Sequence, residues 1–226
     1  MIREIKLKID ATFALIEKYV WAFLIICTPI VTIYEVFRIF IYKLSIWYGF
    51  YNYEYIILLT NFIYNGFYLA LLIFLIHLMY ENKKSSINDL FLFIKQNWWG
   101  IALIVLVIQI LTNIGLFLLI LPGVYIFSRL VVAPYLFSID GYKIYNSFRL
   151  SFIYSTEHIW TLFLTTIFLS IPVIPLIIIK RFVPSQILVS IITILMQLYY
   201  ITGVVLYYMF YLEIKEHMIK DLQNNK

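Results

Sequence analysis

The chain has little charge, glycine, proline or cysteine. Only 13% of its 226 residues are charged and 64% are hydrophobic, whereas a soluble domain has about 25% charged and about 45–50% apolar residues. These values, with a mean hydropathy of +0.94, exclude a soluble enzyme. The seven glycines, six prolines and 19% aromatic residues exclude disordered and fibrous proteins. The single Cys27 permits no intrachain disulfide and no cysteine-based metal cluster.

Catalytic motifs are lacking as well. The sequence has no glycine-rich phosphate loop with a lysine, no His-Glu-x-x-His and no nucleophile elbow, so we predict neither an enzyme nor a cofactor. Glu213, Glu216 and His217 lie close together after the last apolar stretch. A zinc site needs three ligands in a fixed geometry, and a charged tail helix explains these residues better. Because the aromatic residues lie in apolar stretches, we expect no nucleic-acid partner.

Six apolar stretches predict an all-α membrane protein with a single transmembrane domain. A bilayer core of about 30 Å is crossed by about 20 apolar residues in a helix. The first stretch contains Glu35 and Arg38 near one end, and the fourth is short and interrupted by Arg129 and Pro134. We predict that the six spans pair into three hairpins. The stretches are 19–41, 55–80, 98–121, 124–139, 159–179 and 187–212.

Lysine and arginine are unevenly divided between the two sides that six spans define. With the N-terminus inside, 12 of the 17 basic residues lie on the cytoplasmic side, four on the opposite side and Arg129 within a span. The positive-inside rule therefore predicts that both termini are cytoplasmic. The first stretch follows a charged segment and lacks a small-residue cleavage site, so it is not predicted to be a signal peptide. Leu121-Pro122-Gly123 alone connects the third and fourth spans, which predicts a tight hairpin.

Three segments before outgoing spans share one layout. Each begins with Phe, ends with Trp eight residues later and carries polar residues shortly before the Trp; the segments are 13–21, 91–99 and 152–160. We interpret them as parts of cytoplasmic interfacial helices within residues 1–18, 84–97 and 141–158, each preceding a hairpin. Ser86 and Asp89 predict the N-cap of the second. The alternative is that tryptophan, common at membrane interfaces, produces the likeness alone.

Arg129 is the most informative polar residue. An arginine at the centre of a span costs about 2.5–3.5 kcal/mol on insertion scales, so it must reach a partner or water. One interpretation is a polar pathway in which Arg129 pairs with Glu35. The other, which we favour because the fourth span is short, is that Arg129 extends to the outer interface while Glu35 and Arg38, three residues apart, pair with each other.

Amide side chains form the second polar group inside the predicted spans. Asn61 with Asn65, and Gln109 with Asn113, each place two amides on one helical face. Amides in lipid usually join helices, at about 0.6 kcal/mol each. A substrate groove is the alternative. Gln197 is a fifth amide of this kind.

One part of the sequence is similar to a known family. It begins with an apolar run that contains Pro-Gly, followed by a short span with Ala-Pro. An acidic residue and a polar helix come next, before the fifth span. In order, these features lie at Ile114 to Tyr125, Ala133-Pro134, Asp140, and Lys143 to Arg149 with Ser151 to Trp160. These features resemble the YciC-like family of six-span bacterial inner-membrane proteins and, more distantly, the membrane domain attached to some glycerophosphodiester phosphodiesterases. The resemblance implies a bacterial inner-membrane location and supplies no catalytic residue. The chain departs from the pattern in its short, aromatic first outer loop and in Arg129.

These observations favour a non-enzymatic integral membrane protein that acts in envelope maintenance or in the assembly of membrane proteins. Its expected partners are the lipid bilayer and either itself or other membrane proteins. The alternative is a small transporter or lipid-handling channel that uses Arg129 and the amides. The two functions differ in one structural respect, because transport requires a water-accessible crevice that converges on Arg129.

The predicted topology is testable with reporter fusions. A reporter active only outside the cytoplasm is expected to give signal when fused near Tyr51 or Val183 and none at either terminus, because an even number of spans and the charge asymmetry place both termini inside. Signal from a C-terminal fusion would contradict the six-span topology.

Overall fold

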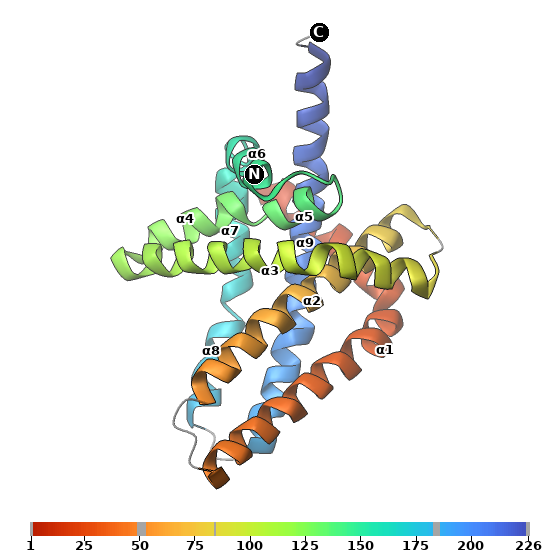
Figure 1. Cartoon of the computed structure of the whole chain (residues 1–226). Coiled ribbons are helices and arrows are strands. Elements are labelled where there is room, and N and C mark those ends of the chain that lie inside the picture. Colours follow the sequence, from red (N-terminus) through yellow and green to blue (C-terminus); the bar gives the residue numbers. More distant parts are fainter. Residues whose placement is uncertain (1, 49–52, 84, 183–185, 225–226) are drawn as a thin grey trace.

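The computed structural model describes residues 2–48, 53–83, 85–182 and 186–224. All regular elements in these ranges are helices (Figure 1). The loop positions Tyr51 and Val183, used above for topology, lie outside the described residues. The helices are α1 (Ile2–Tyr48), α2 (Tyr53–Glu81), α3 (Ile87–Leu118), α4 (Ile120–Leu130), α5 (Ala133–Ser138), α6 (Ile144–Tyr154), α7 (Ile159–Ser170), α8 (Val173–Phe182) and α9 (Gln186–Asn224).

Six helical stretches are long and apolar enough to cross a membrane, which confirms the predicted all-α, multi-pass fold. Their lengths range from 18 to 40 residues, so each is close to or longer than the roughly 20 residues that cross a bilayer core. The stretches are Ile5–Leu44, Tyr55–Glu81, Ile87–Leu118, Leu121–Ser138, Ile159–Ile179 and Ile191–Asp221.

The segments expected to form separate interfacial helices are helical where described, but only one of them is a separate helix. The N-terminal segment is continuous with the first span in α1 and is set off by a kink at Tyr19, whose φ of −120° and ψ of 15° are not helical. The second segment begins at the Ser86 N-cap, where Ser86 and Asp89 form the predicted capping box, and runs without a break into the span as α3. The third is α6, which a turn at residues 155–158 separates from α7.

Two of the predicted spans are broken by proline-containing segments. The fourth consists of α4 and α5, and Pro134 lies in the first turn of α5. The fifth is interrupted at Ile171 and Pro172, between α7 and α8. Proline lacks an amide hydrogen and disfavours helical geometry in the preceding residue, so these breaks follow from the sequence although the apolar pattern runs across them.

The connection between α3 and α4 lies slightly earlier than predicted. Leu119, with extended φ and ψ of −165° and 151°, separates the two helices. Pro122 and Gly123, expected to form the turn, instead belong to the first turn of α4, where a proline needs no hydrogen-bond donor.

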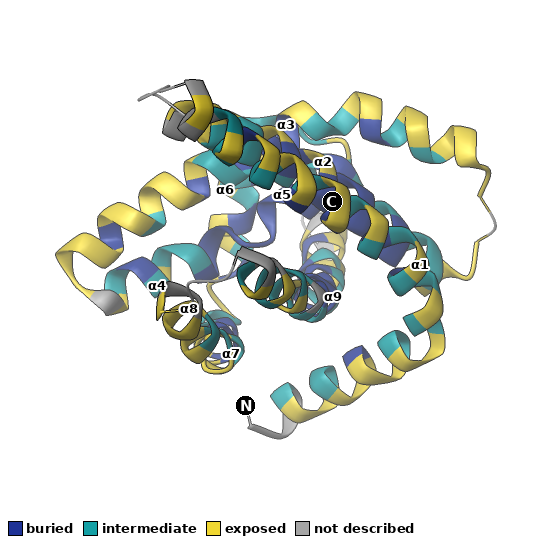
Figure 2. Cartoon of the chain, turned by 90° about the horizontal axis from the view of Figure 1, so that it is seen from below, coloured by how far each residue is buried: buried dark blue, intermediate teal, exposed yellow. Residues whose placement is uncertain are grey.

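The helices do not form one parallel bundle. Figure 1 shows α3 and α4 side by side and crosswise to α7, α8 and α9, and Figure 2, turned by 90°, shows α7 and α9 end-on with α4 lengthwise. The N-terminal part of α1 bends away at the kink and lies close to α9 and α7. This crosswise arrangement was not predicted from the sequence.

The buried core lies where α2 and α9 pass each other, with α1 and α5 beside them (Figure 2). Leu72 and Ile76 of α2 and Tyr208 and Tyr211 of α9 are fully buried. Lipid chains are as apolar as these side chains, so close van der Waals packing, rather than escape from water, holds such a core together.

Close approach of α3 and α4 depends on a pair of glycines. A Cβ added to Gly115 would lie 2.6 Å from the Cα and 2.8 Å from the backbone nitrogen of Gly123. Small residues of this kind let membrane helices pack backbone to backbone. A larger residue at position 115 would collide with main-chain atoms of Gly123. Main-chain atoms cannot move aside by a change of rotamer, as a side chain can.

We therefore expect Gly115→Ala to lower the stability of the purified protein by about 1–3 kcal/mol, the usual cost of overpacking. Thermal unfolding in detergent measures the effect, at about 2–4 °C of midpoint per kcal/mol for a chain of this size. Gly203→Ala is the matched control, because the nearest atom to its added Cβ is Leu169 Cδ1 at 3.7 Å. Equal midpoints for the two variants would contradict the glycine contact.

Candidate functional site

Arg129 lies in the last turn of α4 and is 8% exposed. Its Nη1 donates to the backbone oxygen of Phe152 at 2.7 Å and to the hydroxyl of Thr156. Its Nε and Nη2 donate to the Tyr125 hydroxyl at 3.1 and 3.0 Å. The guanidinium is also 4.4 Å from the centre of the Phe152 ring, a distance at which the ring face attracts a cation. Protein groups therefore satisfy this charge.

The backbone of Arg129 strengthens the same contact. Its carbonyl oxygen, near the end of α4, accepts hydrogen bonds from the Ser151 hydroxyl at 2.8 Å and the Ser155 hydroxyl at 3.2 Å. The last carbonyls of a helix have no partner within the helix. Side chain and main chain of one residue thus bind α4 to the C-terminal end of α6 and the turn after it.

One of the two predicted alternatives for Arg129, its pairing with Glu35, differs from this arrangement. Glu35 accepts from Nε and Nη2 of Arg38 at 3.0 and 2.8 Å, which confirms the pairing expected from their three-residue spacing. Pairing of Glu35 with Arg129 was therefore wrong. The guanidinium of Arg129 contacts α6 and the turn that follows it, and its extension to the outer interface stays a prediction.

The predicted amides do not converge on one site. Asn61 accepts a hydrogen bond from the Tyr34 hydroxyl, which joins α1 to α2, and Asn65 is half-buried. Gln109 and Asn113 of α3 are both exposed, and within the part of the chain that the structure describes neither side chain forms a hydrogen bond. Gln197 of α9 is half-buried.

Tyrosines form a polar core that the sequence analysis did not identify. Tyr34 stacks on Tyr64 with ring centres 3.8 Å apart, and Tyr64 stacks on Tyr68 at 5.3 Å. Between α9 and α7, the hydroxyls of Tyr207 and Thr166 are 3.0 Å apart. Twenty tyrosines in one chain are a signal of such packing, but which rings meet depends on the fold.

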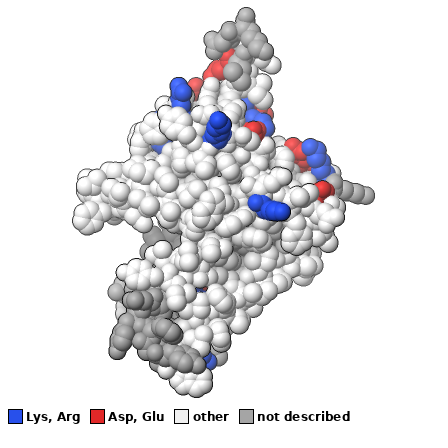
Figure 3. All heavy atoms as spheres, in the orientation of Figure 1, with Lys and Arg blue, Asp and Glu red and all other residues white. Residues whose placement is uncertain are grey.

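A charged cluster lies where α9 leaves the core towards the C-terminus. Figure 3 shows charged side chains gathered at this end of the visible face, whereas most of the remaining surface is uncharged. Asp140 accepts from Lys215 at 2.5 Å and from the Tyr211 hydroxyl at 3.0 Å, and Lys8 of α1 pairs with Glu213 at 2.5 Å. The cluster therefore connects α1, α9 and the segment after α5.

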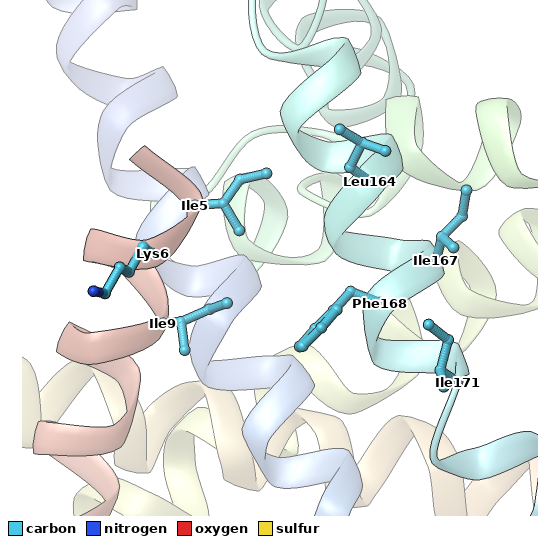
Figure 4. A pocket seen from close by; sticks show the side chains of 7 residues that line it. All are labelled: Ile5, Lys6, Ile9, Leu164, Ile167, Phe168 and Ile171. Atoms are coloured by element: carbon cyan, nitrogen blue, oxygen red, sulfur yellow. The ribbon is translucent and has the colours of Figure 1, made fainter. Parts of the chain in front are cut away.

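An apolar groove of about 390 Å³ opens between the N-terminal part of α1 and α7 (Figure 4). Ile5 and Ile9 form one wall, and Ile167 and Phe168 are on the other. The ammonium of Lys6 points away from the groove, so only the stem of this side chain contributes to the lining. The groove offers hydrocarbon contact and no polar group for chemistry.

No protein-family model, curated protein or solved structure matches this chain. The resemblance to the YciC-like family stays a prediction from the sequence.

The hydrogen bonds of Arg129 depend on the planar shape of its guanidinium as well as on its charge. We expect Arg129→Lys to lower the free energy of unfolding by about 2 kcal/mol, because one ammonium does not reproduce the planar fork that binds Tyr125, Phe152 and Thr156 together. Thermal unfolding in detergent measures this. Arg149→Lys is the control, since Arg149 is an exposed residue of α6; a tolerated Arg129→Lys would show that charge alone suffices.

Proposed function

We propose that the protein is a non-enzymatic component of the bacterial inner membrane that associates laterally with a second copy of itself, in envelope maintenance or membrane-protein assembly. The observation that carries this proposal is the pair of exposed amides, Gln109 and Asn113, on the apolar helix α3. The bacterial inner-membrane location is supported by the sequence resemblance.

An amide that faces lipid is unfavourable, because hydrocarbon offers its N–H and C=O groups no hydrogen bonds. Gln109 and Asn113 are four residues apart and lie on one face of α3, within a stretch long and apolar enough to span a membrane. A second helix placed against this face supplies the missing partners. Other polar side chains of the spans, such as Asn61 and Arg129, already have theirs within the chain.

A second copy of the chain fits this face by chemistry and by symmetry. Each amide both donates and accepts, so Gln109 and Asn113 of one copy pair with the same residues of another across a two-fold axis. Beside them Ile110, Ile114 and Phe117 are 49%, 54% and 92% exposed, and these side chains supply the apolar contact around the amides.

The alternative of a transporter or lipid-handling channel has less support in the described residues. Such a path requires Arg129 and the amides to line the same water-accessible crevice. Arg129 is instead enclosed between α4 and α6, whereas Gln109 and Asn113 are exposed on α3. The apolar groove beside α7 includes none of these residues in its lining.

Disulfide crosslinking tests the proposal, since Cys27 is the only native cysteine and is replaced by alanine for this purpose. In vesicles, Ile114→Cys on α3 is expected to give a covalent dimer on mild oxidation, and the exposed Ile178→Cys on α8 is expected to give none. Leucine at both amide positions removes two pairs between copies, each worth about 0.6 kcal/mol. Association should therefore weaken by roughly eightfold.

Gln96→Leu is the matched control, because Gln96 is an exposed amide on the same helix outside the proposed face. It should leave the dimer yield unchanged. Equal crosslinking at Ile114→Cys and Ile178→Cys, or a yield insensitive to loss of both amides, would refute self-association through α3.

A further inference from the structure

Three potential metal ligands come together at the charged end of the molecule, from parts of the sequence about 60 residues apart. Glu157 and His158 lie in the turn between α6 and α7, and His217 lies in the last third of α9. One ligand atom from each lies within 4.8 Å of the other two. Along the sequence, the acidic neighbours of His217 are Glu213 and Glu216, and the meeting with Glu157 and His158 arises only in the fold.

The distances agree with a zinc site after a small adjustment. Ligands about 2.1 Å from a tetrahedral zinc ion lie about 3.4 Å from each other. Nδ1 of His217 and Oε2 of Glu157 are already 3.4 Å apart, and the rings of His158 and His217 have centres 5.4 Å apart at 67° to each other. Glu157 is 69% exposed in its side chain, so its carboxylate moves without disturbing the core.

The chemistry of the set is that of a zinc ligand group. Two imidazole nitrogens and one carboxylate oxygen are the ligands that zinc takes in sites where a fourth position is left for water. Hard cations such as magnesium prefer oxygen ligands alone. Two histidines therefore select zinc or a similar transition metal over magnesium and calcium.

A fourth residue is placed to support the ligands. Oε2 of Glu213 lies 3.7 Å from Nδ1 of His158 and also pairs with Lys8 of α1. Carboxylates beside a metal-bound imidazole commonly fix the orientation of the ring and raise its basicity. This arrangement is unlike a chance pair of surface histidines, because the side chain of His158 is only 12% exposed.

We propose that Glu157, His158 and His217 bind a zinc ion, with Glu213 as the residue that positions His158. The ion connects the α6–α7 turn to α9 and, through Glu213 and Lys8, to the N-terminal part of α1. The proposal does not depend on self-association, because its residues lie in the α6–α7 turn and α9, whereas Gln109 and Asn113 lie in α3.

The test uses the full chain, purified in detergent with an affinity tag that contains no histidine. Zinc is titrated against a fluorescent chelator to measure affinity and stoichiometry, and cobalt is added separately because a tetrahedral cobalt site absorbs visible light. We expect one zinc per chain and a cobalt spectrum of the tetrahedral type. A higher thermal midpoint with zinc is also expected, since a ligand that binds only the folded state stabilises it.

Substitutions of the ligands and of the supporting residue are expected to weaken zinc binding to different degrees. His158→Ala, His217→Ala and Glu157→Gln each remove a ligand and are expected to weaken zinc binding by more than about 100-fold, whereas Glu213→Gln should weaken it by about 10–100-fold, the usual effect of losing a supporting residue. His77→Ala is the matched control: His77 is the third histidine of the chain, and it lies in α2, where it contacts Tyr208 and Glu81.

Glu157→Gln keeps the proposal testable if a histidine variant fails to fold, because the replaced side chain is exposed and nearly isosteric. Wild-type affinity in Glu157→Gln and His217→Ala would overturn the proposal, as would the absence of zinc binding by the unaltered protein. An equal loss in His77→Ala would also overturn it, because binding would then not be specific to this cluster.

Discussion

The structure depends on one constraint: a polar group inside a bilayer has no water to bind, so it must find its partner in protein. Arg129 meets this constraint most completely, since its guanidinium donates to α4 and to the end of α6 while its carbonyl accepts from two serines. Some buried hydroxyls meet it locally, as where Thr166 donates to the carbonyl of Leu162 one turn earlier. On α3, Gln109 and Asn113 are exposed and have no hydrogen-bond partner among the described residues, and this pair carries the proposed function.

The same constraint explains where the chain departs from straight spans. Breaks before α5 and α8 leave backbone groups without their helical partners. At the end of α4, Ser151 of α6 and Ser155 of the turn after it donate to the carbonyl oxygen of Arg129. Irregular backbone at such depth persists because neighbouring protein groups complete its hydrogen bonds.

How much of the structure could be predicted depended on whether an interaction is local in the sequence. The membrane class, the helices, the Ser86 capping box and the Glu35–Arg38 pair follow from runs or spacings of a few residues. The Arg129 partners and the meeting of Glu157 with His217 join segments far apart, so packing decides them. The crosswise placement of α3 and α4 could likewise not be predicted from the sequence. An apolar run has the same composition whatever direction its helix takes.

The contact between the first and last helices has a consequence for biogenesis. The N-terminal part of α1 is held by α9, where Lys8 pairs with Glu213 and its ammonium lies 4.3 Å from the centre of the Phe210 ring. During synthesis α1 is made before α9, and the residues that secure it follow about 200 positions later. Contacts of such long sequence separation form late and slowly, so the interface of α1 remains incomplete until α9 has been made. A chain truncated before α9 would leave that interface open, because Glu213 and Phe210 would be missing from it.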